Sequence, residues 1–561
     1  MSAALAYAPR DLAAEPRPTP AAAPVAAMPA AAPAAPSPVP AAVPAWRVAL
    51  YGAASIFLGV TQGLGINLVS ANLPGIQGSL GVTQIESNWL VAAYMATNLA
   101  GTVVLYKMRT QFGLRRFAEL GLLFYVVVTA AHLLADDLRS AVILRAVMGI
   151  ATAPLSTLAF FYMLEVMPPA RKLTVGLCFG LMGGQIAVPL ARLISPDLLE
   201  LGHWHGLYLL ETGLALVSLA IVFLLPITHP PRQKVIDRVD LLAIPLLAIG
   251  TGAIAVLMTV GRLYWWFDTP WLGSLAAVGI LALTALLILE LQRAHPMIDL
   301  RWLSSSEMLI FAGSLLVFRI LLGEQTSGMI GFMTMLGLQN DQLATLYLII
   351  LAATVAGLVV TSLLMGPGRT PMIHMTALVL IAVAAFLDSH ATSLSRPEQF
   401  YATQAMMAFA GAMFLPPALQ VGFGQALKRG GNAIVSFLVV FTGTQTLGGM
   451  IGAAGLGTFV TLREKLHSSA LVEQLTAVNT LVGERVQLYA NAYAKALADP
   501  ALRTAEGAVQ LGKAATLQAT VLAYDDLFLL IAALAVGALA ILILHQAVVL
   551  CRASRATPAA A

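Results

Sequence analysis

Residues 308–332 read MLIFAGSLLVFRILLGEQTSGMIGF, an almost uninterrupted apolar run. A membrane-spanning helix needs about 20 predominantly apolar residues, so this run is long enough to cross a bilayer. Arg319 and Glu324 nevertheless lie inside it. A charge at the bilayer centre costs at least about 2.5–3.5 kcal/mol, so such residues usually face a protein interior or a water-filled cavity. The stretch therefore predicts a membrane helix whose embedded charges have a partner or a function.

The composition of the whole chain is that of a membrane protein. Hydrophobic residues make up 59% and charged residues 10% of its 561 positions, whereas soluble domains carry about 25% charged residues. The net charge is only +4, and the basic residues form short clusters between apolar runs, which argues against nucleic-acid binding. Cys178 and Cys551 belong to no Cys-x-x-Cys motif, so we expect no disulfide, metal site or cofactor.

Apolar runs long enough to cross a bilayer recur along the chain, so the sequence predicts an all-α polytopic membrane protein. The fourteen predicted spans are 48–70, 88–106, 117–135, 140–164, 173–195, 204–226, 239–261, 271–291, 308–332, 341–365, 372–390, 400–424, 434–461 and 525–549. Residues 1–45 are rich in Ala and Pro and lack the features of a secretory signal, so we expect a disordered tail. Residues 551–561 form a second tail.

The distribution of Lys and Arg sets the orientation. Connections after even-numbered spans carry most of the basic residues, namely Lys107, Arg109, Arg115, Arg116, Arg171, Lys172, Arg232, Lys234, Arg238, Arg293, Arg301, Arg369, Lys428 and Arg429. Because basic loops stay on the cytoplasmic side, both termini are predicted to be cytoplasmic. The one long connection, 462–524, then lies outside. Leu, Val and Tyr recur in it at helical spacing, which predicts amphipathic helices separated near Asp499 and Pro500.

Several local sequences occur in an order that resembles a known family. They are ANLPGIQGSLG at 71–81, NWLVAAYMATNLAG at 88–101, LRAVMGIATAPL at 144–155, MPPARK at 167–172 and HPMIDLRWL at 295–303. The third contains Arg145 and Gly149 in an Arg-x-x-x-Gly motif. With the span count and the long outer loop, these stretches resemble the EmrB/QacA-type drug:proton antiporters of the major facilitator superfamily. The resemblance covers most of residues 46–550.

The resemblance implies two six-helix bundles, 46–230 and 301–550, with two inserted helices at 231–300. Substrate would bind near the midplane between the bundles, which rock to alternate access. Such proteins lie in the bacterial inner membrane and export amphipathic organic compounds in exchange for protons. Many of them work with a periplasmic adaptor and an outer-membrane channel, which would contact the outer loop. The alternative is that this loop caps the chain's own outer face.

Three positions depart from the family pattern. The family usually has an Asp in the first span where this chain has Gly65, and an acid in the loop after the second span where it has Thr110. In the fifth span, Val188 precedes the motif's Pro and Arg192 stands where a Gly is expected. Proton antiport therefore does not follow from the resemblance alone.

The candidates for proton coupling are Glu211, Glu324 and Arg145. A carboxyl group in a low-dielectric interior can take up a proton near neutrality, which proton-coupled transport requires. Glu211 lies in the sixth span and would replace the acid missing from the first. By the resemblance, Arg145 would interact with the proton-carrying acid. The alternative for Glu211 is a structural ion pair with an arginine, and for Glu324 one with Arg192 or Arg145.

The candidates for substrate binding are Arg319, Arg192, Asn67 and Gln325. Arg319 and Glu324 are five residues apart and point about 140° apart on a helix, so they are poor partners for each other. Three embedded arginines against two acids favour an anionic or zwitterionic substrate at least as much as a cationic dye. Arg192 can alternatively extend outward to water, and neutral polar residues such as Asn67 can simply join helices.

The leading interpretation is a secondary active transporter that exports amphipathic organic compounds by proton antiport with alternating access. The broken antiporter motif leaves open proton-coupled or facilitated transport of an organic anion. A third alternative is a degenerate, non-transporting membrane scaffold. We expect no enzyme, because the sequence has no G-x-S-x-G motif, no P-loop and no His/Cys metal spacing.

Overall fold

The computed structural model describes residues 44–168, 171–227, 234–293, 296, 299–429, 431–476 and 478–556. The chain divides at Pro44, and the architecture below is that of the unit that begins at Ala45. Nearly all of the predicted tail 1–45 lies outside the described residues, as do parts of the motif stretches 167–172 and 295–303. Of the predicted tail 551–561, residues 551–556 continue the last helix and the rest is not described.

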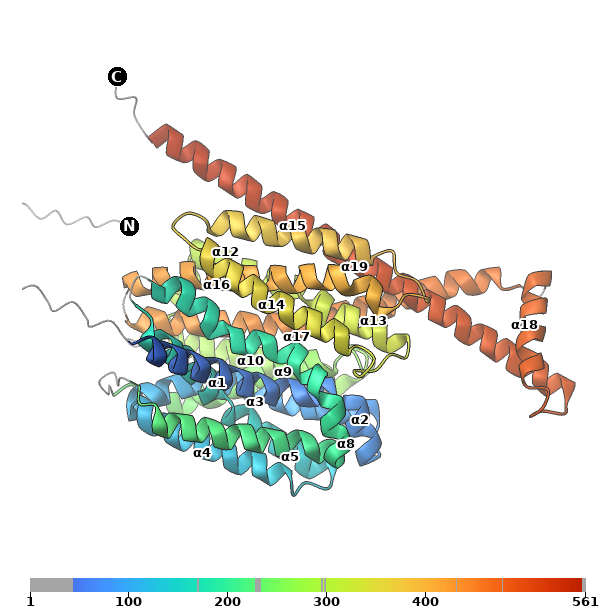
Figure 1. Ribbon diagram of the computed structural model, residues 1–561, viewed down its shortest axis with the longest axis horizontal. Helices are drawn as coiled ribbons and strands as arrows, with labels where there is room; N and C mark the ends of the chain where they lie inside the picture. The colour runs from blue at the N-terminus through green and yellow to red at the C-terminus, as the bar shows by residue number, and fades with distance from the viewer. Residues whose placement is uncertain are drawn as a thin grey trace, which may run out of the picture. The chain divides into compact units, whose positions relative to one another are not determined.

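The described residues form helices and contain no β-strand (Figure 1). The first helices are α1 (Ala45–Ala71), α2 (Leu73–Leu80), α3 (Gln84–Phe112), α4 (Leu114–His132), α5 (Leu138–Ala151), α6 (Ala153–Val166), η1 (Lys172–Gly176) and α8 (Leu177–Leu224). The next are α9 (Asp240–Val260), α10 (Pro270–Leu291), α11 (Leu300–Leu303), α12 (Ser306–Leu321), η2 (Glu324–Met329) and α13 (Ile330–Met335). The last are α14 (Ala344–Leu364), α15 (Thr370–Asp388), η3 (Pro397–Phe400), α16 (Tyr401–Arg429), α17 (Gly431–Gln474), α18 (Thr480–Ala492) and α19 (Pro500–Ala556).

The all-α, multi-span fold class is confirmed. Among the described residues, thirteen helical segments are long and apolar enough to cross a membrane, and they correspond to thirteen of the predicted spans. The predicted span at 117–135 corresponds to α4, a helix of 19 residues that carries Arg115, Arg116 and Glu119 near its start. α4 packs along α8 and α5, which both contribute to such segments. It is therefore one helix of the same bundle.

Two predicted spans lie within α8, and the chain turns between them (Figure 1). His203 has a left-handed backbone with φ 51°. A Cβ atom at Gly206 would collide with the carbonyl oxygen of Leu198. Residues eight apart in a straight helix are about 12 Å apart, so this contact requires a reversal. Glycine is needed at 206 because the returning chain leaves no room for a side chain.

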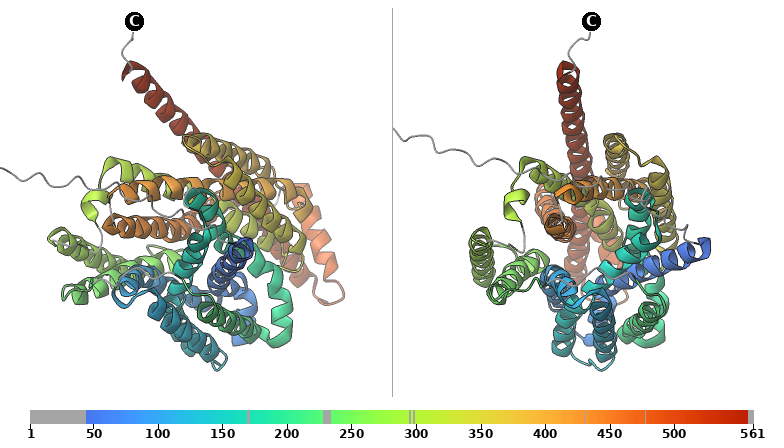
Figure 2. Two further views of the ribbon diagram at one scale, coloured as in Figure 1. Left: turned by 60° about the vertical axis from the view of Figure 1, so that its left-hand side comes forward. Right: turned by 90° about the vertical axis from the view of Figure 1, so that its left-hand side faces the viewer.

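We call α1 to α8 the first helix group and α11 to α19 the second, and hydrophobic cores lie in each. Leu58, Tyr125 and Leu158 are buried in the core shared by α1, α4 and α6. Ile381 and Met413 are buried in the core shared by α12, α15, α16 and α19. The helices α9 and α10 pack on each other, and α9 packs on α3. Figure 2 shows this pair, in green, at the edge of the other helices. The domain boundaries at 230 and 300 remain a prediction.

A close helix crossing joins α1 to α8. Gly59 and Gly63 on α1 face Gly183 and Ala187 on α8, so small residues four apart meet on both helices. A Cβ atom at Gly183 would lie 2.8 Å from Gly59 Cα and still closer to the carbonyl oxygen of Ile56. Small residues at this spacing let backbones approach closely in a membrane, where packing replaces the hydrophobic effect.

We expect Gly183→Val to destabilise the protein by about 1–3 kcal/mol, because the added side chain must push α8 away from α1. Thermal unfolding in detergent measures the change. Gly184→Val is the matched control, since no heavy atom lies within 4 Å of a Cβ placed at Gly184. Equal loss of stability in the two variants would contradict the packing described for this crossing.

The predicted outer loop 462–524 is helical. α17 continues to Gln474, α18 follows, and α19 begins at Pro500, where Asp499 Oδ1 accepts a hydrogen bond from Ala501 N at 2.8 Å. α17 and α19 pack along each other, and α18 packs on α19 (Figure 1). At the base of this helical projection, Asp526 Oδ2 lies 2.5 Å from Arg463 Nε and 2.6 Å from His467 Nε2.

Candidate functional site

Glu211 lies on the second half of α8 and is 1% exposed. Its Oε1 atom accepts a hydrogen bond from the Tyr125 hydroxyl at 3.0 Å. No arginine or lysine of the described residues forms a direct ion pair with it. The alternative, a structural ion pair between Glu211 and an arginine, is therefore absent from the described residues. The carboxyl group is held in the protein interior by a neutral phenol.

Gly65, on α1, lies directly beside this carboxyl group. A Cβ atom at Gly65 would lie 2.7 Å from Glu211 Oε1 and 3.4 Å from the Tyr125 hydroxyl. The side chain of Glu211 thus occupies the space into which a side chain at position 65 would project. A side chain on α1 at position 65 and the Glu211 side chain on α8 would therefore compete for the same small volume.

Arg145, on α5, also contacts the backbone at Gly65. It is 1% exposed, and its Nη1 donates to the carbonyl oxygen of Gly65 at 3.0 Å. Its guanidinium carbon lies 4.5 Å from the centre of the Tyr94 ring, a cation–π arrangement. Arg145 and Glu211 therefore both lie beside Gly65, and no ion pair joins them among the described residues; their role in proton coupling stays a prediction.

The Arg-x-x-x-Gly spacing has a structural reason. Gly149 lies one turn after Arg145, where a Cβ atom would collide with Thr97 Oγ1 and the carbonyl oxygen of Tyr94 on α3. Asn98 Nδ2 donates to the Gly149 carbonyl oxygen at 2.9 Å, and Thr97 Oγ1 donates to α5 at 2.6 Å. Glycine lets α5 approach α3, which fixes the position of Arg145.

Two further buried aromatic groups lie in this half. His132, at the end of α4, stacks on Tyr208 with ring centres 4.2 Å apart. Tyr208 lies one turn before Glu211 on α8. The buried Tyr208 hydroxyl faces the Arg145 guanidinium, and His132 Nε2 is buried without a hydrogen-bond partner among the described residues. Tyr208 therefore adds a second phenol to the surroundings of Glu211 and Arg145.

A second buried acid lies in the other helix group and has a neighbour that the sequence analysis missed. Glu324 is 0% exposed, and its Oε1 accepts a hydrogen bond from Gln404 Nε2 at 3.0 Å. The same nitrogen donates to Asp388 Oδ2 at 3.0 Å. Asp388 is the last residue of α15. A charged residue at the end of a membrane span usually contacts water, but Asp388 is buried, with an exposure of 3%. Two carboxyl groups share one amide donor.

Gln325 completes this network. Its Nε2 donates to Gln404 Oε1 at 3.3 Å and to the Gln404 carbonyl oxygen at 3.1 Å. Gln325 is therefore a neighbour of the acid pair. The predicted alternative, an ion pair of Glu324 with Arg192 or Arg145, is wrong, because Glu324 bonds to Gln404 instead.

The backbone around Glu324 is a π-helical segment, η2, inserted between α12 and α13. Such single-turn π segments inside α-helices are frequent at functional sites because they alter the direction of a side chain. Gly328, within η2, lies against Leu527 and Phe528 of α19. A side chain at Gly328 would lie 3.3 Å from both. The segment thus turns Glu324 toward Gln404 while α19 packs behind it.

We expect Gln404→Leu to destabilise the protein by about 1–3 kcal/mol, because it removes the donor shared by two buried carboxyl groups. Denaturant or thermal unfolding in detergent gives the change. Gln420→Leu is the matched control on the same helix, because Gln420 is only half-buried. The proposed network would be contradicted if the two leucine variants were equally stable.

The remaining predicted substrate residues form hydrogen bonds with groups other than these acids. Arg319 Nε donates to the Gln445 carbonyl oxygen on α17 at 3.3 Å. Its guanidinium rests on Gly449, where a Cβ atom would lie 3.2 Å from Nη2. No carboxylate of the described residues forms an ion pair with it. Asn67 Nδ2 donates to the Gly63 carbonyl oxygen of its own helix at 2.8 Å, so it joins no second helix.

Arg192 connects the two helix groups. Its Nη1 donates to Asn340 Oδ1 at 3.3 Å, and Asn340 Nδ2 donates to the carbonyl oxygen of Ala71 at 3.0 Å. The Tyr347 hydroxyl donates to the same Asn340 oxygen at 3.3 Å. Arg192 and Ala71 belong to the first group, whereas Asn340 and Tyr347 belong to the second. Arg192 therefore has a partner across the groups rather than extending outward to water.

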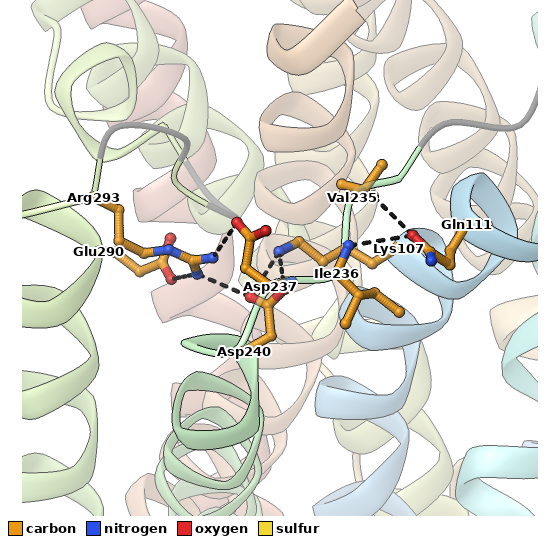
Figure 3. Close-up of polar contacts among 8 residues, drawn as sticks. All are labelled: Lys107, Gln111, Val235, Ile236, Asp237, Asp240, Glu290 and Arg293. Atoms are coloured by element: carbon orange, nitrogen blue, oxygen red, sulfur yellow. Dashed lines mark hydrogen bonds and ion pairs between the residues drawn. The ribbon is translucent and has the colours of Figure 1, made fainter.

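A buried ion cluster, which we call the Asp240 cluster (Lys107, Asp237, Asp240, Glu290 and Arg293), joins α3 to α9 and α10 (Figure 3). Lys107 Nζ lies 2.7 Å from both oxygens of Asp240. Arg293 Nη1 lies 2.9 Å from Asp240 Oδ1 and 2.7 Å from Glu290 Oε1. The side chains of Lys107 and Arg293 are each 7% exposed. The cluster joins α9 and α10 to α3.

A backbone contact reinforces this attachment. Gln111 Oε1, at the end of α3, accepts a hydrogen bond from Val235 N at 2.8 Å and faces Ile236 N at 3.4 Å (Figure 3). The chain that enters α9 is therefore held to α3 by a side chain. In the part of the chain that is described, no group of three or more His, Cys, Asp or Glu residues is arranged to hold a metal ion.

Residues 55–460 match the family model described as Major Facilitator Superfamily. The chain is 22% identical over 452 residues to the fatty acid resistance protein FarB of Neisseria gonorrhoeae, which covers 78% of this chain and 86% of that protein. It is 23% identical over 272 residues to the multidrug export protein EmrB of Haemophilus influenzae. This alignment covers 46% of this chain and 53% of that protein. The chain thus spans about half the length of the second relative.

Among solved structures, the human organic anion transporter MFSD10 (TETRAN) has a similar fold. It superposes with a TM-score of 0.54 at 13% sequence identity, covering 88% of this chain and 100% of that chain. At this level of identity the likeness concerns the arrangement of helices alone.

Proposed function

The chain belongs to the major facilitator superfamily, and from that premise we propose that it is a secondary transporter of a bacterial inner membrane. It exports amphipathic organic compounds in exchange for protons, by alternating access between its two helix groups. The observation that carries this proposal is the Glu211 carboxyl group, which fills the space beside Gly65 on α1. The names of the relatives, a multidrug export protein and a fatty acid resistance protein, support export.

Glu211 is the residue that binds and releases the transported proton. In its anionic form it accepts the Tyr125 hydrogen bond, and the nearby Arg145 guanidinium stabilises the negative charge. In its protonated form the carboxyl group is neutral and can remain in a water-excluded interior. Because Glu211 is closed off from solvent here, exchange with either side requires the helix groups to move apart.

The Glu324–Asp388 pair is a second proton-binding element, in the other helix group. Two carboxyl groups share the Gln404 Nε2 donor, and a proton bound to either one would remove the repulsion between two negative charges. Each helix group would then carry one acidic element. Gln325 orients the pair through Gln404, while Arg319 and Asn67 remain candidates for contact with substrate.

A second function, facilitated or proton-coupled transport of an organic anion, is favoured by Arg319. This half-buried guanidinium has no carboxylate partner among the described residues, so it can pair with an anionic substrate. Arginine suits this role because its planar fork binds a carboxylate through two parallel hydrogen bonds.

Both termini are placed in the cytoplasm by this proposal, with the helical projection outside. The projection exposes apolar side chains such as Leu466, Val472, Leu481, Leu488 and Val509. Exposed apolar residues gathered on one element mark interaction surfaces. They support the docking of a periplasmic adaptor, which would lead exported compounds to an outer-membrane channel.

Transport by inverted proteoliposomes under an imposed pH gradient tests the proposal. Two probes, ethidium as a cationic amphiphile and a fluorescent long-chain fatty acid as an anionic one, distinguish the substrate charge. We expect gradient-driven accumulation of at least one probe. Protein-dependent entry of the fatty acid that only equilibrates it, and that is unaffected by collapse of the gradient, would instead establish facilitated anion transport. Failure of both probes to move would contradict the proposed export of amphiphiles.

A further inference from the structure

We propose that the protein binds a phosphate-bearing anion in a cavity between the end of α10 and the ends of α11, α12 and α16. The cavity has a volume of about 420 Å³. Arg293, Arg301 and Arg429 contribute to its wall together with Trp302 and Ser305. This site is separate from the Glu211 and Glu324 elements, and the proposal does not depend on which compounds are transported.

The acidic groups of the wall are already engaged. Glu290 lies 2.7 Å from Arg293, and Arg293 also lies 2.9 Å from Asp240 in the Asp240 cluster. Asp299 Oδ1 accepts a hydrogen bond from Trp302 N at 3.1 Å. Within the described residues, these contacts leave Arg301 and Arg429 as cavity cations without an acidic partner.

Arg429 is held in position by an aromatic ring. Its guanidinium carbon lies 5.6 Å from the centre of the Trp302 ring. Trp302 is itself 5% exposed and packs with Met308 and Leu419 in a hydrophobic cluster. A guanidinium stacked on a fixed ring keeps its donors free and loses less conformational freedom on binding. Arg429 is therefore preorganised for an anion rather than freely mobile.

The wall also contains an unsatisfied hydroxyl group. Ser305 Oγ is buried and has no hydrogen-bond partner among the described residues. A buried polar atom without a partner costs about 1–3 kcal/mol, and a bound oxyanion would satisfy it. Two guanidinium groups and a hydroxyl are a donor set that matches the oxygens of a phosphate, which arginine binds through paired hydrogen bonds.

The position of the cavity indicates two sources of the phosphate group. It lies at the predicted cytoplasmic end of the helices, and basic pockets between membrane helices on that side bind anionic lipid head groups. A free phosphate anion in the cytoplasm offers the same oxygens. In either case the anion would connect α10, which the Asp240 cluster fixes to α3, with α11 and α16 of the second helix group.

The experiment uses the full chain in nanodiscs of neutral phosphatidylcholine, with and without phosphatidylglycerol, and with inorganic phosphate added to the neutral discs. The midpoint of thermal unfolding and the number of phosphatidylglycerol molecules retained in native mass spectrometry are measured. The test variant is Arg301→Gln/Arg429→Gln, and both side chains are exposed, so its folding should be unaffected. Arg238→Gln is the control, an exposed arginine predicted on the same side that is not part of the cavity wall.

We expect phosphatidylglycerol to raise the unfolding midpoint of the wild type and of Arg238→Gln. Its apparent affinity should fall at least about tenfold in the double variant, because charge-assisted hydrogen bonds are lost. If inorganic phosphate in neutral discs also raises the unfolding midpoint of the wild type and of Arg238→Gln, and does so less in the double variant, the site binds a soluble anion. The proposal is overturned if neither anion affects the wild type, or if both stabilise the wild type and the double variant equally.

Discussion

Replacing Glu211 with Gln will abolish proton-driven transport, reducing probe accumulation to the level of vesicles without protein. Glutamine keeps the size of the side chain and can still accept the Tyr125 hydrogen bond, so the fold should persist. It cannot bind and release a proton at neutral pH. Counterflow of the same probe without a pH gradient should survive, which separates loss of coupling from loss of substrate binding.

The contact between position 65 and Glu211 predicts that the carboxyl group can be moved from α8 to α1. Because a Cβ atom at position 65 would lie 2.7 Å from Glu211 Oε1, Gly65→Asp alone should be inactive through crowding. Combining it with Glu211→Ala removes the obstructing side chain and returns a carboxyl group to the same volume. The double variant should regain gradient-driven transport that neither single variant has.

Glu307→Gln provides the matched control, since Glu307 is an exposed residue in the first turn of α12. It should transport as well as the wild type. Full activity of Glu211→Gln would remove this residue from the mechanism. Failure of the Gly65→Asp/Glu211→Ala combination, with normal folding, would show that position 65 does not share the function of position 211.

Replacing Asp240 with Ala should destabilise the protein by about 3–5 kcal/mol, the typical cost of removing one partner from a buried ion pair. Lys107 would lose both of its carboxylate contacts, and Arg293 would keep only Glu290 and the distant Asp237. Because the Lys107 and Arg293 side chains are each 7% exposed, water cannot readily replace Asp240. Chemical unfolding in detergent measures the loss.

Two comparisons make this result specific. Asp237→Ala should cost less than about 1 kcal/mol, because the Asp237 side chain is 60% exposed and lies 3.5 Å from Arg293. Lys107→Met/Asp240→Leu replaces the pair by apolar groups and should recover much of the stability lost in the single variant. Equal stability of the Asp240 and Asp237 variants would show that the cluster does not hold the inserted helices.

The helices could be predicted from sequence because each span carries its own signal of length and apolarity. The run 308–332 is an example, since α12, η2 and α13 together cover it. The π-helical turn at Glu324 could not be predicted, because it depends on how α16 and α19 pack around that turn. The helicity of 462–524 could be predicted from its periodicity. The single long α19 could not, because its outer part packs on α17 and α18, and these contacts leave no local sequence signal.

The candidate acids could be predicted because charge in an apolar run is costly and therefore conspicuous. Their partners could not. Asp388 and Gln404 are on different helices, and only the packing of α15 on α16 places them together. Lys107 and Asp240 are 133 residues apart, and each alone resembles an ordinary charged residue at the end of a span. No local pattern indicates which of several such residues will meet.

The most direct test measures proton binding without any substrate. The purified protein, reconstituted on a solid-supported membrane, is exposed to a sudden change of external pH, and the transient charge displacement is recorded. The wild type should give a transient current, Glu211→Gln should lose it, and Gly65→Asp/Glu211→Ala should restore it. A current of unchanged amplitude in Glu211→Gln would contradict the assignment of the transported proton to this carboxyl group.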